Sequence, residues 1–146
     1  MLTKEAIVEH YPNGQLEWRI PIEWHVVGAY RFHGEAVSYY PTGEIKIRKV
    51  YEHGLLVGDE VMYYRDGSVM SILPFKAGRK EGVYSFRHPD GSQEECEYKD
   101  GEPVDGSIRK LDQQGKEKKG NAAKREPNPE PKKILPGDHI PTSLAG

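Results

Sequence analysis

The sequence predicts an all-β protein, a single elongated antiparallel meander of stacked β-hairpin repeats. Three observations predict this fold class: glycine recurs with a fixed period, segments rich in β-branched and aromatic residues separate the glycines, and no stretch before residue 120 carries a sustained 3.6-residue apolar stripe. The 146-residue chain has a net charge of −2, one cysteine and no run of 18 apolar residues. Neither a disulfide framework nor a membrane-spanning helix is therefore expected.

The first element of the repeat is a turn glycine that follows a small polar or charged residue. Two phased sets of glycines are expected to set turns with positive φ, a conformation that costs a residue with a Cβ about 1 kcal/mol or more. The first set is Gly14, Gly43, Gly67, Gly91 and Gly115, with spacings of 29, 24, 24 and 24 residues. The second set is Gly34, Gly58, Gly82 and Gly106, each of which stands nine residues before a member of the first set. The longer first interval predicts about five inserted residues within 21–32.

The segments between the glycines are the expected strands. EAVSYY, EIKIRKVY, EVMYY, SVMSILPF and VYSF have the composition and length typical of strands and end at turn residues. A unit of about 24 residues then holds two short strands and two turns. This predicts a repeat domain over residues 5–119, with about nine or ten strands. Residues 120–146 hold five of the 11 prolines and are predicted to form a flexible, disordered tail.

Aligning the units gives columns of side chains. On the strand after each turn glycine, residues two and four places on are expected to share one face, because side chains alternate along a strand. These residues are Leu16, Ile45, Val69 and Gln93, and Trp18, Ile47, Ser71 and Glu95. The same alternation predicts that one tyrosine of each adjacent pair, Tyr39/Tyr40 and Tyr63/Tyr64, is buried and that the other is exposed.

An exposed aromatic column is a candidate surface for binding a protein partner. Tyr39 and Tyr63 share such a column with Arg87, and tyrosine and arginine are prominent in binding hot spots. Cross-strand packing that fixes the register is the alternative role for these tyrosines. Trp24 and His25 lie within the inserted segment of the first unit, where a departure from repeat geometry favours partner contact.

An acidic stretch over residues 94–105 adds Glu95 and Glu97 as candidate partner-binding residues. It holds six acidic residues against one lysine. One interpretation is a soluble end cap, because the outer side of a terminal repeat has no neighbour to bury it. The other is that its charge meets a basic protein partner.

Catalytic residues, a metal site and cofactors are not expected. Cys96 stands among glutamates that would raise its thiol pKa, which predicts an inert thiol. Nucleic-acid binding would need more basic residues between the aromatic ones. The histidines match no HExxH motif and show no metal-ligand spacing: His10, His25, His33, His53, His88 and His139.

Residues 39–86 resemble consecutive MORN-type repeats of the variant form. The tyrosine, aromatic and glycine positions of that repeat are filled by Tyr40, Gly43, Tyr51, Gly54 and Gly58, and then by Tyr64, Gly67, Phe75, Gly78 and Gly82. The resemblance covers roughly residues 10–111. The first unit lacks the middle glycine, and the fourth is one residue short between Gly91 and Gly101.

The resemblance implies a curved sheet of stacked hairpins that binds a partner and has no chemistry of its own. A stand-alone chain of this size resembles the bacterial YwqK-type group of antitoxin and immunity proteins. It implies a non-enzymatic protein that neutralises a toxin by binding and blocking it. A cytoplasmic location is expected because the sequence has no run of 18 apolar residues and no apolar signal-peptide segment at its start. The alternatives are a MORN-type scaffold that binds another protein or membrane lipid headgroups and, third, an enzyme. The oligomeric state stays open, because an exposed sheet edge can also pair with a second copy.

Overall fold

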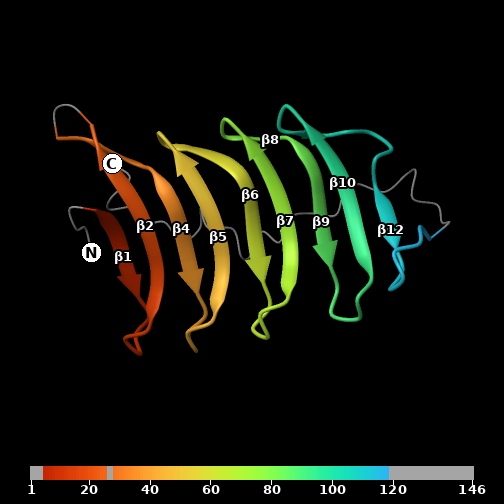
Figure 1. The fold of residues 1–146 in the computed structure, drawn as a ribbon, viewed down its shortest axis with the longest axis horizontal. Coiled ribbons are helices and arrows are strands. Elements are labelled where there is room, and N and C mark those ends of the chain that lie inside the picture. Colours follow the sequence, from red (N-terminus) through yellow and green to blue (C-terminus); the bar gives the residue numbers. More distant parts are fainter. Residues whose placement is uncertain (1–4, 26–27, 119–146) are drawn as a thin grey trace.

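The computed structural model describes residues 5–25 and 28–118. Within these ranges all regular secondary structure is β, in one open antiparallel sheet, which confirms the predicted fold class. Figure 1 shows the strands side by side along one axis, from β1 to β12. In the described ranges no helix is long and apolar enough to cross a membrane. The predicted tail, residues 120–146, lies outside the described residues.

In the described part of the chain, twelve strands form the sheet, and neighbours along its main path follow the order β1-β2-β4-β5-β6-β7-β9-β10-β11. Off this path, β3 pairs with β2, β8 with β7 and β12 with β10. The expected nine or ten strands are too few, because four strands of two or three residues add to eight longer ones. The bounds are β1 (Ala6–His10), β2 (Leu16–Trp24), β3 (Tyr30–Phe32), β4 (Gly34–Tyr39), β5 (Ile45–Glu52), β6 (Leu55–Tyr63), β7 (Val69–Lys76), β8 (Arg79–Lys80), β9 (Gly82–Arg87), β10 (Gln93–Lys99), β11 (Glu102–Pro103) and β12 (Arg109–Leu111).

One edge of the sheet is built from identical tight turns. In the turn between β4 and β5, the Gly43 N–H donates to the Tyr40 carbonyl at 2.9 Å, and the Tyr40 N–H donates to the Glu44 carbonyl at 2.8 Å. Gly43 has a φ of 103°, so the turn is a type I turn closed by a glycine bulge. The same pair of bonds recurs at the turns that begin at Tyr11, Tyr64, His88 and Asp112. All nine phased glycines have positive φ, which confirms that prediction.

The opposite edge uses two-residue turns. Ala77 and Gly78 both have positive φ, the signature of a type I′ hairpin, and the same holds for the pairs at 53–54 and 100–101. The Gly78 N–H donates to the Leu56 carbonyl of the preceding unit at 2.8 Å. Each of these turns is thus bonded to the unit before it, since Gly54 and Gly101 make the equivalent bond.

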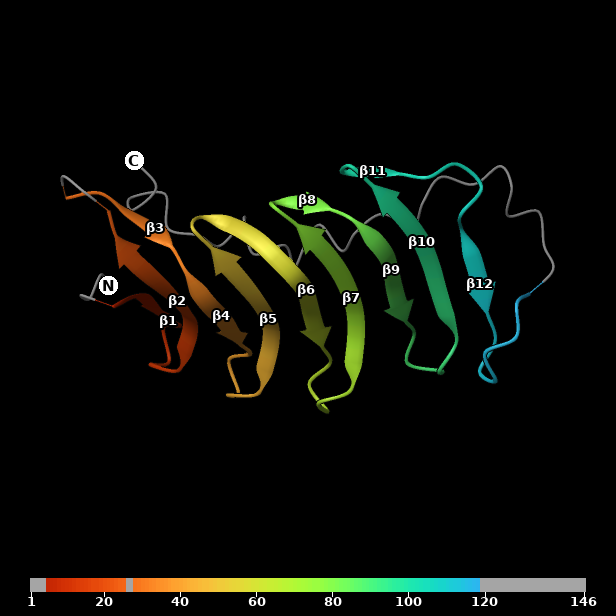
Figure 2. The same ribbon diagram turned by 45° about the horizontal axis from the view of Figure 1, so that its top comes forward.

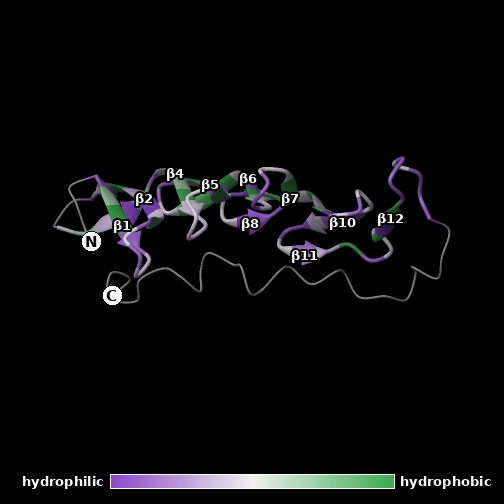
Figure 3. Cartoon of the chain, turned by 90° about the horizontal axis from the view of Figure 1, so that it is seen from below, coloured by the Kyte–Doolittle hydropathy of each residue, from purple (hydrophilic) through white to green (hydrophobic). Residues whose placement is uncertain are grey.

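The short segments that lead into the strands of the main layer are called hairpin arms: β3, the first residues of β6, β8 and β11. Glycine is also required where the chain bends from such an arm into the next strand. Gly82, with a φ of 119°, separates β8 from most of β9, and a Cβ there would lie 3.0 Å from the Pro74 side chain. Tyr98 stands opposite this glycine in β10. The bends turn the arms over one face: Figure 2 shows β3, β8 and β11 curling at this edge, and Figure 3 places β8 and β11 to one side of the main layer.

A β-bulge in each of the first three units overturns the expected alternation after the turn glycine. Ser38 pairs with Ile47 and Tyr39 pairs with Ile45, so Lys46 is an extra residue. Ile45 and Ile47 therefore lie on opposite faces, so the prediction that the two columns share a face is wrong in these three units. It is confirmed for Gln93 and Glu95, which both lie on the outer face. Equivalent bulges occur at residues 17 and 70, whereas β9 and β10 pair without one. The residue missing from the fourth unit is thus the bulge residue.

The register assigns the paired strand residues outside the bulges to one of two faces. The inner face, which the arms cover, holds Ile7, Glu9, Trp18, Ile20, Ile22, Ala36, Ser38, Ile47, Lys49, Tyr51, Glu60, Met62, Ser71, Leu73, Tyr84, Phe86, Glu94, Cys96 and Tyr98. Tyr30, Phe32 and Leu56 from the arms pack against its buried core. A second apolar cluster at the C-terminal end holds Cys96, which is buried. The middle row of the outer face is Val8, Arg19, Val37, Arg48, Val61, Ile72, Ser85, Glu95 and Arg109.

Two charged side chains are buried on the inner face. Lys49 is 3% exposed and Glu60 is 5% exposed. The Lys49 ammonium lies 5.2 Å from the ring centroid of Trp18 and 5.1 Å from that of Tyr51, within range of a cation–π contact. Burial lowers the Lys49 pKa to about 8, and the charge of Glu60 opposes this shift. Burial likewise raises the Glu60 pKa, against the charges of Lys49 and Lys80.

Candidate partner-binding surface

The candidate residues of the exposed column lie together in one row of the outer face, at the edge of the tight turns. This turn row consists of His10, Leu16, Tyr39, Ile45, Tyr63, Val69, Arg87, Gln93 and Leu111. Tyr39 and Tyr63 are half-buried, and Arg87 is exposed. The bulges place Ile45 and Val69 in this row beside the tyrosines. The structure therefore gathers an aromatic, aliphatic and guanidinium surface along the turn edge.

The adjacent tyrosines are not divided into one buried and one exposed residue, so that prediction is wrong. Tyr39, Tyr40, Tyr63 and Tyr64 are all half-buried. The hydroxyl of Tyr40 donates to the Tyr63 carbonyl at 2.7 Å, and that of Tyr64 donates to the Arg87 carbonyl at 2.7 Å. Each hydroxyl reaches the next unit, and partial burial raises the pKa of both.

These bonds form a tyrosine ladder that fixes the turn row. Its first rung is the hydroxyl of Tyr11, which donates to the Tyr39 carbonyl at 2.8 Å. The ladder thus bonds the backbone of Tyr39, Tyr63 and Arg87 in turn, and leaves their side chains uninvolved. The turn tyrosines accordingly have the structural role of fixing register, and the outer tyrosines are displayed on a fixed backbone.

A shallow groove runs beside Tyr63 on this face. It has a volume of about 500 Å³ and lies between the turns at 40–44 and 64–68. The guanidinium of Arg65 lies 5.4 Å from the ring centroid of Tyr40. Charged, aliphatic and aromatic groups share its wall: Glu44, Ile45, Arg48, Tyr63, Arg65, Asp66 and Gly67. The groove can thus receive a side chain with both an apolar part and a polar end.

Trp24 and His25 lie away from this row. Trp24 continues the alternation of Ile20 and Ile22 and therefore projects from the inner side of β2. It is 50% exposed and contacts Tyr30 edge to face, with ring centroids 6.0 Å apart. The N–H of His25 donates to the Ala29 carbonyl at 2.7 Å and closes the loop after β2. A partner that contacts both Trp24 and the turn row would have to reach around the edge of the sheet.

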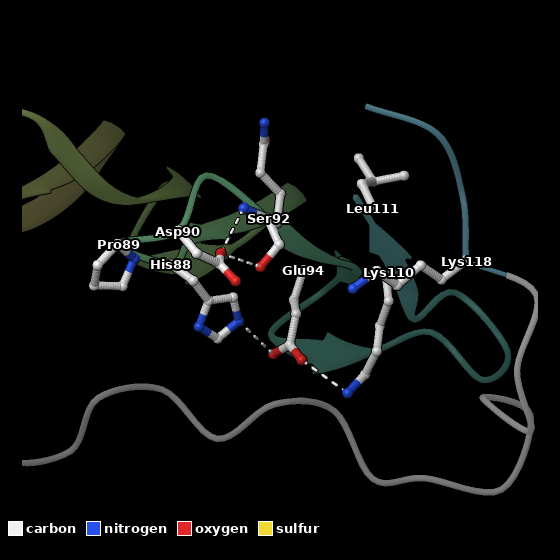
Figure 4. A pocket seen from close by; sticks show the side chains of 9 residues that line it. His88, Pro89, Asp90, Ser92, Glu94, Lys110, Leu111 and Lys118 are labelled. Carbon is white, nitrogen blue, oxygen red and sulfur yellow. Dashed lines mark hydrogen bonds and ion pairs between the residues drawn. The ribbon is translucent and has the colours of Figure 1, made fainter. Parts of the chain in front are cut away.

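At the other end of the sheet, β12 neutralises part of the acidic stretch. Arg109 pairs with Glu95 at 3.0 Å on the outer face, and Lys110 pairs with Glu94 at 2.9 Å. Figure 4 shows Glu94 between Lys110 and His88, in an open pocket of about 520 Å³. Of the two acidic residues predicted to bind a partner, Glu95 is therefore engaged in an ion pair with Arg109, whereas Glu97 is exposed on the outer face.

A cluster of two histidines and a carboxylate was not predicted from the sequence. His53 Nδ1 lies 2.6 Å from one Glu23 oxygen, and His33 Nδ1 lies 3.7 Å from the other. Arg31 also donates to Glu23. Hydrogen bonds from His53 and then Arg31 lower the Glu23 pKa to about 2. The two histidines lie 20 residues apart in the sequence, so no local motif indicates that the fold brings them together.

Comparison with known families identifies two repeats. A model of the MORN repeat variant matches residues 32–53 and 56–77, each spanning one unit of the sheet. These matches confirm the MORN-repeat part of the resemblance. Repeats of this kind are generally scaffolds for binding proteins or lipids, and the module is non-catalytic. A search of curated proteins finds no match.

Proposed function

We propose that this protein is a non-enzymatic binding module that holds a protein partner on its outer face. The partner is a toxin, which the protein neutralises in the cytoplasm by covering its active surface. Residues 5–119 serve as the binding domain. The observation that carries this proposal is the turn row, in which Tyr39, Tyr63 and Arg87 stand in line on one face. Aromatic residues and arginine are the side chains that contribute most at protein interfaces.

The tyrosine ladder supports a blocking role because it fixes this surface before the partner arrives. Association costs free energy for every side chain and loop that must be ordered, and a preorganised surface avoids part of that cost. The bonds from Tyr40 and Tyr64 hold the backbone at Tyr63 and Arg87. Obstruction of a toxin requires such a fixed, complementary surface and no catalytic group.

The charge of the outer face favours a protein over an anionic membrane. Three rows of this face are compared: the turn row, the middle row, and the row on the other side of the middle row, which holds Glu35, Asp59 and Glu97. Together they carry equal numbers of arginines and carboxylates. These are Arg19, Arg48, Arg87 and Arg109 against Glu35, Asp59, Glu95 and Glu97. Two arginines are already paired, Arg48 with Glu35 and Arg109 with Glu95. Such a face lacks the excess of basic residues that attracts anionic headgroups.

The test begins with the genes beside this one: the proposal predicts a neighbouring gene for a toxin-like protein, which is then co-expressed with this chain. The wild-type chain should restore growth, and Y63E should abolish protection because it puts a charge at the centre of the turn row. R79E is the matched control, since Arg79 is exposed at the opposite edge of the sheet and should leave protection intact. W24A separately tests the inserted loop.

Circular dichroism should show that each variant keeps its fold. Full protection by both Y63E and W24A would refute this surface as the toxin-binding site. Failure of the wild-type chain to protect, together with binding to vesicles containing anionic lipid, would replace the toxin with a membrane as the partner.

A further inference from the structure

The Glu23–His33–His53 cluster joins three segments that are separate in the sequence. Glu23 belongs to β2, His33 lies between β3 and β4, and His53 begins the type I′ turn after β5. The upper edge of the sheet in Figure 1 brings the end of β2 and the β5–β6 turn to the same level. One ligand atom from each side chain lies within 4.8 Å of the other two.

We propose that this cluster is a binding site for a divalent transition-metal ion, with Zn²⁺ as the ion that fits best. Two imidazole nitrogens and one carboxylate oxygen are a common protein ligand set for zinc and leave a position for water or a partner's side chain. Mg²⁺ and Ca²⁺ prefer oxygen ligands and do not suit a set in which two of three donors are imidazoles.

The cluster needs only small side-chain movements to hold an ion. Ligand atoms around a tetrahedral zinc ion stand about 3.3 Å apart. The 2.6 Å contact from His53 to Glu23 would widen, and the 3.7 Å contact from His33 would shorten. The side chains of His33 and His53 are 40% and 57% exposed, so a hydrated ion can reach them. His33 Nδ1 accepts a hydrogen bond from the His53 N–H at 3.1 Å, and an ion bound at this nitrogen would replace that bond. The rings already lie close, with centroids 4.8 Å apart.

Arg31 occupies the place of the cation in the metal-free protein. Its guanidinium donates to Glu23 and lies 3.1 Å from His53 Nδ1. A bound metal ion must displace this group, because the guanidinium lies against both the Glu23 oxygen and the His53 nitrogen that would bind the metal. The Arg31 side chain is 37% exposed and can move into solvent. Removal of Arg31 should therefore tighten metal binding, which an ion-pair cluster without a metal function would not predict.

A bound ion would tie the inserted loop to the repeat that follows it. Glu23 directly precedes Trp24, the last residue of β2, which pairs with Tyr30 at the start of β3. The metal would link the end of β2 to the β5–β6 turn and so fix the strand end that carries Trp24. This inference does not depend on the proposed function, because zinc binding can be measured without any partner.

The experiment is calorimetric titration of the full-length chain with ZnCl₂, repeated with CoCl₂ while the visible absorption of the bound cobalt is recorded. We expect one zinc ion per chain, no heat from MgCl₂ or CaCl₂, and a cobalt spectrum displaced by zinc. E23Q and H53N should each weaken zinc binding by about tenfold or more. Asn is the substitution of choice at His53, because it tolerates the φ of 49° found there.

R31A should bind zinc at least about threefold more tightly than the wild-type chain, because a competing positive charge is gone. H88N is the matched control, since it removes a half-buried histidine far along the sheet and should leave the affinity unchanged. The proposal is overturned if the wild-type chain binds no zinc at about 1 mM, because a dissociation constant above about 1 mM is too weak for a specific site. It is also overturned if E23Q and H53N bind as the wild type does, or if R31A fails to tighten binding.

Discussion

Replacement of Lys49 by methionine should stabilise the fold at neutral pH. The ammonium is buried between the rings of Trp18 and Tyr51, and its pKa falls from 10.5 to about 8. Because each pH unit of displacement corresponds to 1.36 kcal/mol, carrying the charge in the folded state costs about 3 kcal/mol at pH 7. The cation–π contacts return about 1 to 2 kcal/mol. The charge of Lys80 still offsets that of the buried Glu60 in the variant. We therefore expect K49M to raise the free energy of unfolding by about 1 to 2 kcal/mol.

The sign of the pH dependence follows from the direction of the shift. A folded-state pKa below that of the unfolded chain means that the folded protein prefers the neutral amine, so the cost is fully present below about pH 8. It disappears as the pH rises from 8 to 10.5, where both states lose the proton. The advantage of K49M over the wild-type chain should shrink across the same interval.

Urea unfolding at pH 7 and pH 10 measures the change in the free energy of unfolding and its dependence on pH for K49M. The control is K76M, which replaces an exposed lysine. K76M should change the free energy of unfolding by less than about 0.5 kcal/mol. Comparison with the wild-type chain at each pH cancels the titration of all other groups. If the free energy of unfolding of K49M at pH 7 is lower than that of the wild-type chain by more than about 1 kcal/mol, the reasoning is refuted. The favourable contacts of the ammonium would then exceed the cost of its desolvation.

The remaining predictions concern the ladder, the glycines and the second buried charge. Y64F should lower the free energy of unfolding by about 1 kcal/mol in urea titrations, through loss of the bond to the Arg87 carbonyl, and an unchanged midpoint would contradict the ladder. G67A should cost about 1 kcal/mol and G82A clearly more, because only at Gly82 does the added Cβ also meet a neighbouring side chain; equal melting temperatures would exclude that steric contribution. E60Q should stabilise the fold at pH 7 and lose this advantage in acid, since burial raises the Glu60 pKa and the folded state favours the protonated acid; a pH-independent effect would contradict the assignment.

The turns could be predicted from the sequence because their cause is local. Positive φ is a property of a single residue, and glycine adopts it without steric cost. The phase of Gly43 and its equivalents therefore located every tight turn without knowledge of the strand pairing. The insertion in the first unit was predictable for the same reason, and it corresponds to the end of β2, the loop and β3.

The faces of the strands could not all be predicted, because a bulge depends on the partner strand. Ile45 and Ile47 are two residues apart, and only the pairing of Tyr39 and Ser38 with them reveals the extra residue between. The one-residue deficit of the fourth unit was visible in the sequence. Its meaning, a hairpin without a bulge, required the register of β9 and β10.

No sequence pattern could predict the proposed metal-binding cluster, for a different reason. Glu23, His33 and His53 meet because the bend at Gly34 and the arm of β3 bring the first unit over the turn of the second. No spacing within one helix or one strand relates these three residues. Such a site follows from tertiary curvature, which single-strand periodicity does not encode.

The tyrosine ladder separates the residues that determine the fold from those available for binding. The hydroxyls of Tyr11, Tyr40 and Tyr64 bond only to backbone carbonyls of the turn row, so the side chains of that row carry none of the ladder. A tyrosine can therefore be replaced there by an arginine, as Arg87 illustrates, without loss of a rung. Where His88 stands in place of the turn tyrosine, the ladder ends, and the inner face closes with the ion pair of Glu94 and Lys110. A repeat organised in this way can change its binding specificity along one row while its register stays fixed.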